Sequence, residues 1–266
     1  MLFENTNVYN FEGSLKGMRN PMNSWDKSDS FFGIVDLYNG NAMNDMAEKW
    51  GNEEESYKWL KVNGILRASD AYDGLFEVAF IGPADMKLAQ GLVLAGAEHA
   101  KFLRQIFVSV DITAPLYWWK EFDTYKVGTV ANSTSTMHKL SSTPLNKDVF
   151  EFDNLDLLID NYTLPLGGQV TRVFEDYVDD ILDMCENLRL KFIKTGDAAY
   201  WKALIQILPN AYLQTRTVTM SYANLRNIYF QRHRHKLTEW HMFCDWIQTL
   251  PYSKELITLG GKDETH

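Results

Sequence analysis

One alternating segment, residues 105–113, most constrains the fold of this chain. Its apolar residues fall at every second position and are Ile106, Val108, Val110 and Ile112. Because strand side chains alternate between two faces, this pattern predicts a strand that is buried on one side. Pro115 brings no backbone N–H to a sheet, so we expect the strand to end at Ala114-Pro115.

A helix and then a polar loop are expected after this strand. Residues 116–122 read as the start of a helix. Residues 124–136 then contain seven hydroxyl-bearing side chains, counting Tyr125. A run this polar, placed directly after buried elements, is where we expect chemistry.

Composition restricts the class of protein. The 266 residues fit one domain over 1–266, with 40–75 as an exposed helical insertion, and 45% of them are apolar. A net charge of −9 and a pI near 5.2 argue against a nucleic-acid or membrane-surface binder. The absence of a signal peptide and of a long apolar run predicts a cytoplasmic protein, and two cysteines are too few for a disulfide framework or a cysteine metal site.

Helical spacing recurs along the chain. From Pro83, Leu88, Leu92 and Ala95 form a line that His99 continues, so His99 is either a core histidine or a functional one. Residues 141–166 read as irregular. A long amphipathic helix is expected from Thr171, with an apolar line of Val173, Tyr177, Ile181, Met184, Leu188 and Phe192, and with solvated acids on its outer face.

Further helices follow this long one. Gly196 should end the long helix and Asp197 should cap the next, which runs from Ala198 to Leu208. A further apolar line uses Val218, Tyr222, Leu225 and Tyr229, and a final helix uses Leu237, Trp240, Cys244 and Ile247. The resulting fold class is α/β (α+β), rich in helices in its second half.

A basic cluster departs from the acidic composition. Its members are Arg216, Arg226, Arg232, His233, Arg234, His235 and Lys236. Arginine's planar fork suits phosphate or carboxylate, so one reading is an anion-binding site. The other reading is a set of ordinary surface ion pairs. No glycine-rich phosphate loop, His-Glu-x-x-His helix or Gly-x-Ser-x-Gly elbow is present, and both cysteines fall in helical patterns typical of a core.

The order of these pieces resembles the flavin-dependent thymidylate synthase family. That order is a helix followed by a histidine, an alternating strand, Ala-Pro, a helix, a hydroxyl-rich motif, Leu-Pro, and a late Asn-x-x-x-x-Arg. The matching positions are His99, residues 105–113, Ala114-Pro115, residues 124–136, Leu208-Pro209, and Asn227 with Arg232. The resemblance implies an antiparallel sheet core with long helices.

The family's signature, R-H-R-x-x-S-x-N-E-x-S-x-R, contacts flavin and nucleotide. Aligning Ala114-Pro115 with the family's Ala-Pro lays residues 124–136 over this signature, where only Lys126, Thr129 and Thr134 keep similar chemistry. The resemblance implies Arg232 as the catalytic residue. It implies His99, Lys126, Asn132 and Asn227 as FAD-binding residues, and Thr129, Thr134, Thr136 and Arg216 as substrate-binding residues. No metal site is implied.

The implied activity is one-carbon transfer from methylenetetrahydrofolate to C5 of dUMP or a related pyrimidine nucleotide, with FAD as cofactor and NADPH as co-substrate. Arg232 would polarise the pyrimidine by stabilising negative charge on it. The resemblance also implies a homotetramer, and divergent copies of this kind resemble those of bacteriophages and their bacterial hosts. The alternative is a nucleotide-binding or interaction module of the same fold that has lost flavin and catalysis.

Overall fold

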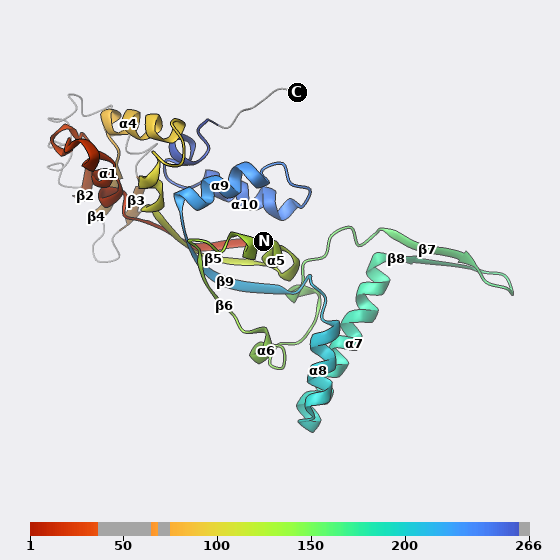
Figure 1. Ribbon diagram of the computed structural model, residues 1–266. Coiled ribbons are helices and arrows are strands. Elements are labelled where there is room, and N and C mark those ends of the chain that lie inside the picture. The colour runs from red at the N-terminus through yellow and green to blue at the C-terminus, as the bar shows by residue number, and fades with distance from the viewer. Residues whose placement is uncertain (37–64, 69–74, 261–266) are drawn as a thin grey trace. The chain divides into compact units, whose positions relative to one another are not determined.

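The computed structural model describes residues 1–36, 65–68 and 75–260, and it has the expected α+β character (Figure 1). The strands are β1 (Leu2–Tyr9), β2 (Phe31–Asp36), β3 (Ile65–Ala68), β4 (Leu75–Phe80), β5 (Phe107–Pro115), β6 (Val130–Ser133), β7 (Leu158–Thr163), β8 (Gln169–Val173) and β9 (Leu213–Ser221). The α-helices are α1 (Phe11–Arg19), α4 (Pro83–Leu94), α5 (Leu116–Phe122), α6 (Thr136–Lys139), α7 (Phe174–Thr195), α8 (Ala198–Ile207), α9 (Tyr222–Arg232) and α10 (Thr238–Gln248).

The strands form three sheets in the described residues. One has four strands in the order β1-β5-β9-β6, one has three in the order β2-β4-β3, and β7 with β8 forms a hairpin. The pairs β2–β4, β3–β4 and β7–β8 are antiparallel. The paired strands and the helices together confirm the predicted α/β (α+β) fold class.

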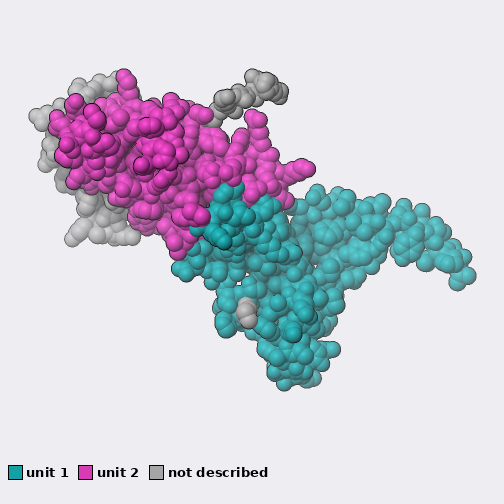
Figure 2. Space-filling view, viewed as in Figure 1, with its two compact units in different colours: residues 1–4, 111–126, 131–217 teal, residues 5–110, 127–130, 218–266 magenta. Residues whose placement is uncertain are grey.

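The chain divides into two compact units, coloured separately in Figure 2. Unit 1 contains residues 1–4, 111–126 and 131–217; unit 2 contains residues 5–110, 127–130 and 218–266. Each strand of the four-stranded sheet has residues in both units. The organisation of residues 1–266 as a single domain stays a prediction.

The strand predicted from alternation is β5. The side chains of Ile106, Val108, Val110 and Ile112 are all at most 1% exposed. Burial of each such side chain contributes about 1.5–3 kcal/mol. α5 begins directly after Pro115, as expected, and buries Trp118, Trp119 and Phe122, whose rings contact one another.

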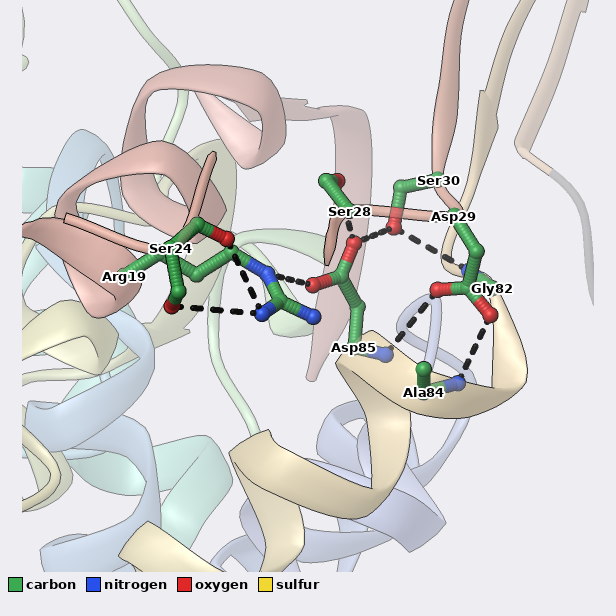
Figure 3. A network of polar contacts seen from close by, with 8 residues as sticks. All are labelled: Arg19, Ser24, Ser28, Asp29, Ser30, Gly82, Ala84 and Asp85. Atoms are coloured by element: carbon green, nitrogen blue, oxygen red, sulfur yellow. Dashed lines mark hydrogen bonds and ion pairs between the residues drawn. The ribbon is translucent and has the colours of Figure 1, made fainter. Parts of the chain in front are cut away.

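Within unit 2, a buried ion pair and the hydrogen bonds around it connect the end of α1 and the loop after it to α4 (Figure 3). The Asp85 carboxylate accepts hydrogen bonds from Arg19 Nε at 2.5 Å, from the Ser28 hydroxyl at 2.6 Å and from the Ser30 hydroxyl at 2.5 Å. Arg19 is 6% exposed and Asp85 is fully buried. The Asp29 side chain accepts from the backbone N–H groups of Ala84 and Asp85, which otherwise lack partners in the first helical turn.

The apolar line predicted around His99 is wrong. α4 ends at Leu94, and its buried residues are Asp85, Met86, Ala89 and Val93 rather than the predicted set. His99 lies in an exposed turn beyond the helix, because Gly96, with φ of 108°, breaks the helical path. His99 is therefore not a core histidine.

The long helix α7 is confirmed, but its predicted inner face is one step out of register. Its buried residues are Val178, Leu182, Cys185 and Arg189, while Ile181 and Met184 of the predicted line are exposed. The helix starts at Phe174, since residues 169–173 pair with β7 instead. Gly196 ends α7 at φ 69°, and Asp197 caps α8, as predicted.

Several strands were missed. Val218, placed on a helical line by the sequence, lies in β9, and residues 141–166, read as irregular, contain β7. The helical insertion predicted for 40–75 lies mostly outside the described residues, although residues 65–68 form β3 rather than helix. The final helix agrees with α10, whose Trp240, Cys244 and Ile247 are buried. In the described part of the chain, no helix has the length and apolar character that a membrane crossing requires.

Candidate functional site

A cavity of about 790 Å³ opens in unit 2 beside α9. It is lined by Val93, Gly96, Ala97, Ala100, Leu103, Arg104, Phe107, Val127, Gly128, Ser221, Ala223, Asn224, Arg226, Asn227, Phe230 and Gln231. This set combines apolar and aromatic walls with a few amides and two cations, which is the usual make-up of a small-molecule site. No lining residue carries a carboxylate.

The two cations of the lining are held differently. Arg226 donates from one guanidinium nitrogen to the carbonyls of Ile257 at 2.6 Å and Leu259 at 2.7 Å, and its guanidinium lies 4.8 Å from the centre of the Phe230 ring. Burial lowers the pKa of Arg226 below its ordinary value. Arg104 is about half exposed and lies 4.0 Å from Glu98. Arg104 is therefore the cation better able to turn towards a bound anion.

The first turn of α9 fixes one wall of the cavity. The Ser221 hydroxyl accepts from the Asn224 N–H, and Asn224 Oδ1 accepts from the Ser221 N–H and hydroxyl, which forms a capping box. Asn224 Nδ2 also donates to the Val127 carbonyl at 2.7 Å. Gly128 has φ of 75°, and an added Cβ would lie 3.2 Å from Asn224 Oδ1, so glycine fits this turn.

One predicted site residue, Asn227, lines the cavity. Its Oδ1 accepts from Gln231 Nε2 at 2.8 Å, which leaves its own amide N–H groups for a ligand. The turn that carries His99 contributes Ala97 and Ala100 to the lining. Thr129, one residue beyond the lining Gly128, has a buried hydroxyl without a hydrogen-bond partner in the described part of the chain.

Arg232 ends α9 and is half-buried. Its guanidinium lies over the Trp240 ring of α10, 4.7 Å from the ring centre, and it is not among the residues that line the cavity. Asn227 and Arg232 are therefore on one helix, five residues apart.

A second group of predicted residues gathers around Gln214 in unit 1. Gln214 Nε2 donates to the Thr134 carbonyl at 2.9 Å and to the Thr136 hydroxyl at 3.3 Å, while its Oε1 accepts from Arg216 Nε at 2.9 Å. Arg216 also pairs with Asp123 at 2.7 Å and lies 4.2 Å over the Trp119 ring. These contacts hold Arg216 rigidly within its own unit. Lys126 and Asn132 of the same unit are exposed.

Several residues of the cavity were missed by the sequence. Arg104 and Asn224 line it but were not singled out, although Ser221-x-x-Asn224 is a capping pattern that marks the start of α9. Burial raises the pKa of Cys185 to about 11 and that of Cys244, which also faces Asp245, to about 12, so neither is a thiolate at neutral pH. No cluster of metal-ligating side chains occurs among the residues that the structure describes.

Comparison with known proteins finds similarity only among solved structures. No family model matches the chain, and no curated protein sequence matches it. The chain is similar to the flavin-dependent thymidylate synthase ThyX of Helicobacter pylori complexed with FAD and dUMP, at 17% identity and a TM-score of 0.47, over 85% of this chain and 95% of that one. A second structure of that enzyme with FAD and dUMP gives 15% identity and a TM-score of 0.48, over 87% and 100% of the two chains.

A third similar structure is the UMP/dUMP methylase PolB from Streptomyces cacaoi bound with 5-Br UMP. It shares 15% identity with this chain at a TM-score of 0.48, over 66% of this chain and 83% of that one. Two of these three structures are of a flavin-dependent thymidylate synthase, the family whose order of motifs this sequence resembles. Identities and scores at this level assign no activity to this chain.

Proposed function

We propose that this protein binds a pyrimidine nucleotide and transfers a one-carbon unit to C5 of dUMP or a related nucleotide, as a divergent flavin-dependent thymidylate synthase. The observation that carries the proposal is the cavity beside α9, which has cations, amides and aromatic walls and no lining carboxylate. An anionic, planar ligand is the chemistry that such a lining favours. The order of motifs along the chain supports the same family.

The cavity residues fit a phosphorylated, ring-containing ligand, which is the nucleotide itself or a cofactor such as FAD. Arg104 and Asn227 would donate to its phosphates or ring carbonyls, and Phe107 or Phe230 would pack against its flat ring. When bound, the reduced cofactor would supply the electrons of the reaction, with methylenetetrahydrofolate as the one-carbon donor and NADPH as the reductant. Lys126 is the one cation left at the positions of the family's Arg-His-Arg.

In this proposal Arg232 is the catalytic residue. It stabilises negative charge that develops on the pyrimidine, which is an electrostatic role that needs no protein nucleophile. The stacking of its guanidinium on Trp240 fixes its orientation in advance. His99, Thr129, Thr134, Thr136, Arg216 and Asn132 remain proposed ligand contacts, with a homotetramer as the proposed assembly.

The first test is the affinity of the purified protein for dUMP, measured by isothermal titration. Arg104→Ala should weaken binding about tenfold, the loss of one charge-assisted hydrogen bond of about 1.5 kcal/mol. Lys101→Ala is the matched control, because Lys101 lies on the same short 3-10 helix and near the same Glu98 but does not line the cavity. Equal affinity of both variants and the wild type for dUMP would show that dUMP does not bind in this cavity.

Arg232→Ala should abolish turnover, while its thermal melt stays close to that of the wild type. Arg234→Ala, an exposed neighbour, should leave turnover unchanged. Turnover is measured as tritium release from C5-labelled dUMP with the folate donor, FAD and NADPH present. Full activity of Arg232→Ala contradicts its assigned role.

The second candidate, a nucleotide-binding module without flavin, is favoured by one observation. At the first two positions of the family's cationic signature stand Thr124 and Tyr125, and the Thr124 hydroxyl donates to the Glu121 carbonyl within its own helix end. A yellow protein with flavin absorbance supports the enzyme. A colourless protein that takes up no added FAD, yet melts at a higher temperature with dUMP, supports the module.

A further inference from the structure

Arg226 of α9 is a half-buried cation that has no carboxylate partner among the described residues. It lines the cavity, and its Nη1 donates to the backbone carbonyls of Ile257 at 2.6 Å and Leu259 at 2.7 Å. Burial lowers the pKa of Arg226 below its ordinary value, because the charged form is partly removed from water. A charge in such a place is normally paired with an opposite one. The described part of the chain therefore leaves a positive charge in the cavity without an acid beside it.

The Arg226 guanidinium keeps one edge for a ligand. Its Nη1 has two N–H groups and serves the two carbonyls, and its central carbon lies 4.8 Å from the centre of the Phe230 ring. Within the described part of the chain, Nε and Nη2 make no hydrogen bond or ion pair. These two nitrogens form the edge of the planar group whose N–H bonds are parallel, and such an edge pairs with two oxygens of one phosphate. The unused edge of Arg226 therefore fits an anion of this kind.

The two carbonyls belong to residues 253–260, which we name the 253–260 segment. It begins with a single π-helical turn, η6 (Ser253–Ile257), which packs against α4 and α9 within unit 2 and is dark blue in Figure 1. Leu256 and Ile257 are fully buried, and the Thr258 N–H donates to the carbonyl at the start of the turn at 2.8 Å. A buried and hydrogen-bonded segment of this kind can hold the Arg226 side chain in one position.

We propose that Arg226 is a fixed phosphate-binding residue of the cavity, and that the 253–260 segment holds it in place for the ligand. The family resemblance assigns no role to Arg226. Arg104, the other cation of the lining, is about half exposed and turns to the ligand, whereas Arg226 has no need to move. Because one guanidinium contacts both the segment and the phosphate, ligand binding and order in the segment favour each other. The inference rests on the proposed function only in taking the ligand of the cavity to carry a phosphate.

Amide hydrogen exchange of the ligand-free protein tests the support that the segment gives. Arg226→Lys keeps the positive charge but has a shorter reach and no planar edge, so the amides of the 253–260 segment should exchange at least about tenfold faster than in the wild type. Arg104→Lys is the matched control, because Arg104 also lines the cavity but pairs with Glu98, and it should leave this exchange unchanged. Circular dichroism checks that both variants fold. Equal exchange of the segment in the two variants would overturn the proposal.

Two phosphate-bearing probes, dUMP and inorganic pyrophosphate, test the contact with the ligand. At saturation, a probe that binds should slow exchange of the 253–260 segment in the wild type at least about tenfold, because binding stabilises the state that it selects. Arg226→Lys should bind the same probe at least about tenfold more weakly, since a lysine ammonium cannot pair with two phosphate oxygens along one edge.

The outcomes separate this inference from the proposed function. If pyrophosphate binds and slows the exchange while dUMP does not bind, the role of Arg226 stands and the proposed nucleotide is wrong. If dUMP binds without slowing the exchange, or binds Arg226→Lys as tightly as the wild type, the role of Arg226 is wrong and the proposed function stands. Absence of binding by both probes would overturn both.

Discussion

The carboxylate of Asp85 shows how one residue can connect several segments of the chain. Burial alone raises the pKa of Asp85, but hydrogen bonds from Ser28, Ser30 and Arg19, with the positive charge of Arg19, outweigh it and lower the pKa below its usual range. The donors come from the end of α1 and from the loop before β2, whereas Asp85 lies in the first turn of α4. Asp85 therefore connects parts of unit 2 that are more than fifty residues apart in sequence.

Replacing Asp85 should be costly. Asp85→Asn leaves the buried Arg19 without its charged partner, so we expect a loss of about 3–5 kcal/mol in the free energy of unfolding, measured with urea. Asp26→Asn, an exposed acid of the same loop, should change it by less than about 0.5 kcal/mol. Equal stability of the two variants would show that the ion pair is dispensable.

The same pair predicts a pH dependence. Because the folded pKa of Asp85 lies below the unfolded value of about 3.9, its contribution is fully present above that pH and is lost as the pH falls through the folded pKa. The difference in stability between the wild type and Asp85→Asn should therefore be constant near neutral pH and shrink in acid. Urea titrations at several pH values measure it, and a gap that widens in acid would contradict the assigned direction.

At the scale of elements, the sequence predicted those whose apolar pattern is uninterrupted. β5, α5 and α10 agree with their patterns because their inward positions are apolar, apart from Glu239 of α10. β9 was missed because Gln214 and Arg216 occupy positions on its inner side, where hydrogen bonds and a ring contact satisfy them. The face of α7 was misjudged because two adjacent lines of this helix are apolar, and the line of Val178, Leu182 and Cys185 is the more deeply buried of the two.

The candidate site was less predictable than the fold. Asn227 was identified through the resemblance and lines the cavity, whereas Arg104 comes from a short 3-10 helix without a recognisable motif. Arg104 reaches the cavity only because of the path that the chain takes in three dimensions. Local pattern carries no information about it.

Two glycines give opposite expectations for the same substitution. Gly196→Ala should destabilise the protein by about 1 kcal/mol, because Gly196 ends α7 with φ of 69°. Gly91→Ala should stabilise it by about 0.5–1 kcal/mol, because Gly91 lies inside α4 with no atom within 4 Å of an added Cβ. Thermal unfolding of the two variants measures both changes in stability. Changes of the same sign would contradict the opposite effects expected for a glycine at a helix end and one inside a helix.

At the scale of the molecule, unit 2 is assembled from segments at the two ends of the chain. The Phe11 ring of α1 packs edge-on against Tyr222 at 5.6 Å and Tyr252 at 5.7 Å. The Tyr252 hydroxyl donates to the Ala79 carbonyl and accepts from the Ile81 N–H, both at 3.0 Å. Tyr252 is thus shared by the first helix, the end of β4 and the last turn of the described chain.

Removing one hydroxyl should therefore affect the whole of unit 2. Tyr252→Phe keeps the ring but leaves the buried Ile81 N–H without its partner, so we expect a loss of about 1–3 kcal/mol in the free energy of unfolding. Tyr162→Phe, which removes a hydroxyl from a half-exposed ring of the hairpin, should cost less than about 0.5 kcal/mol. Chemical denaturation of the two variants compares them, and a loss at Tyr162 as large as at Tyr252 would contradict this account.

The contact of Phe11 with Tyr222 and Tyr252 also determines when α1 can pack during synthesis on the ribosome. α1 emerges from the exit tunnel well before its aromatic partners, which are translated more than two hundred residues later. At about 5–20 residues per second, the nascent apolar side of α1 waits for roughly ten seconds or longer before its partners exist. A chaperone that shields α1 as it emerges should therefore raise the yield of folded protein more than one added after release.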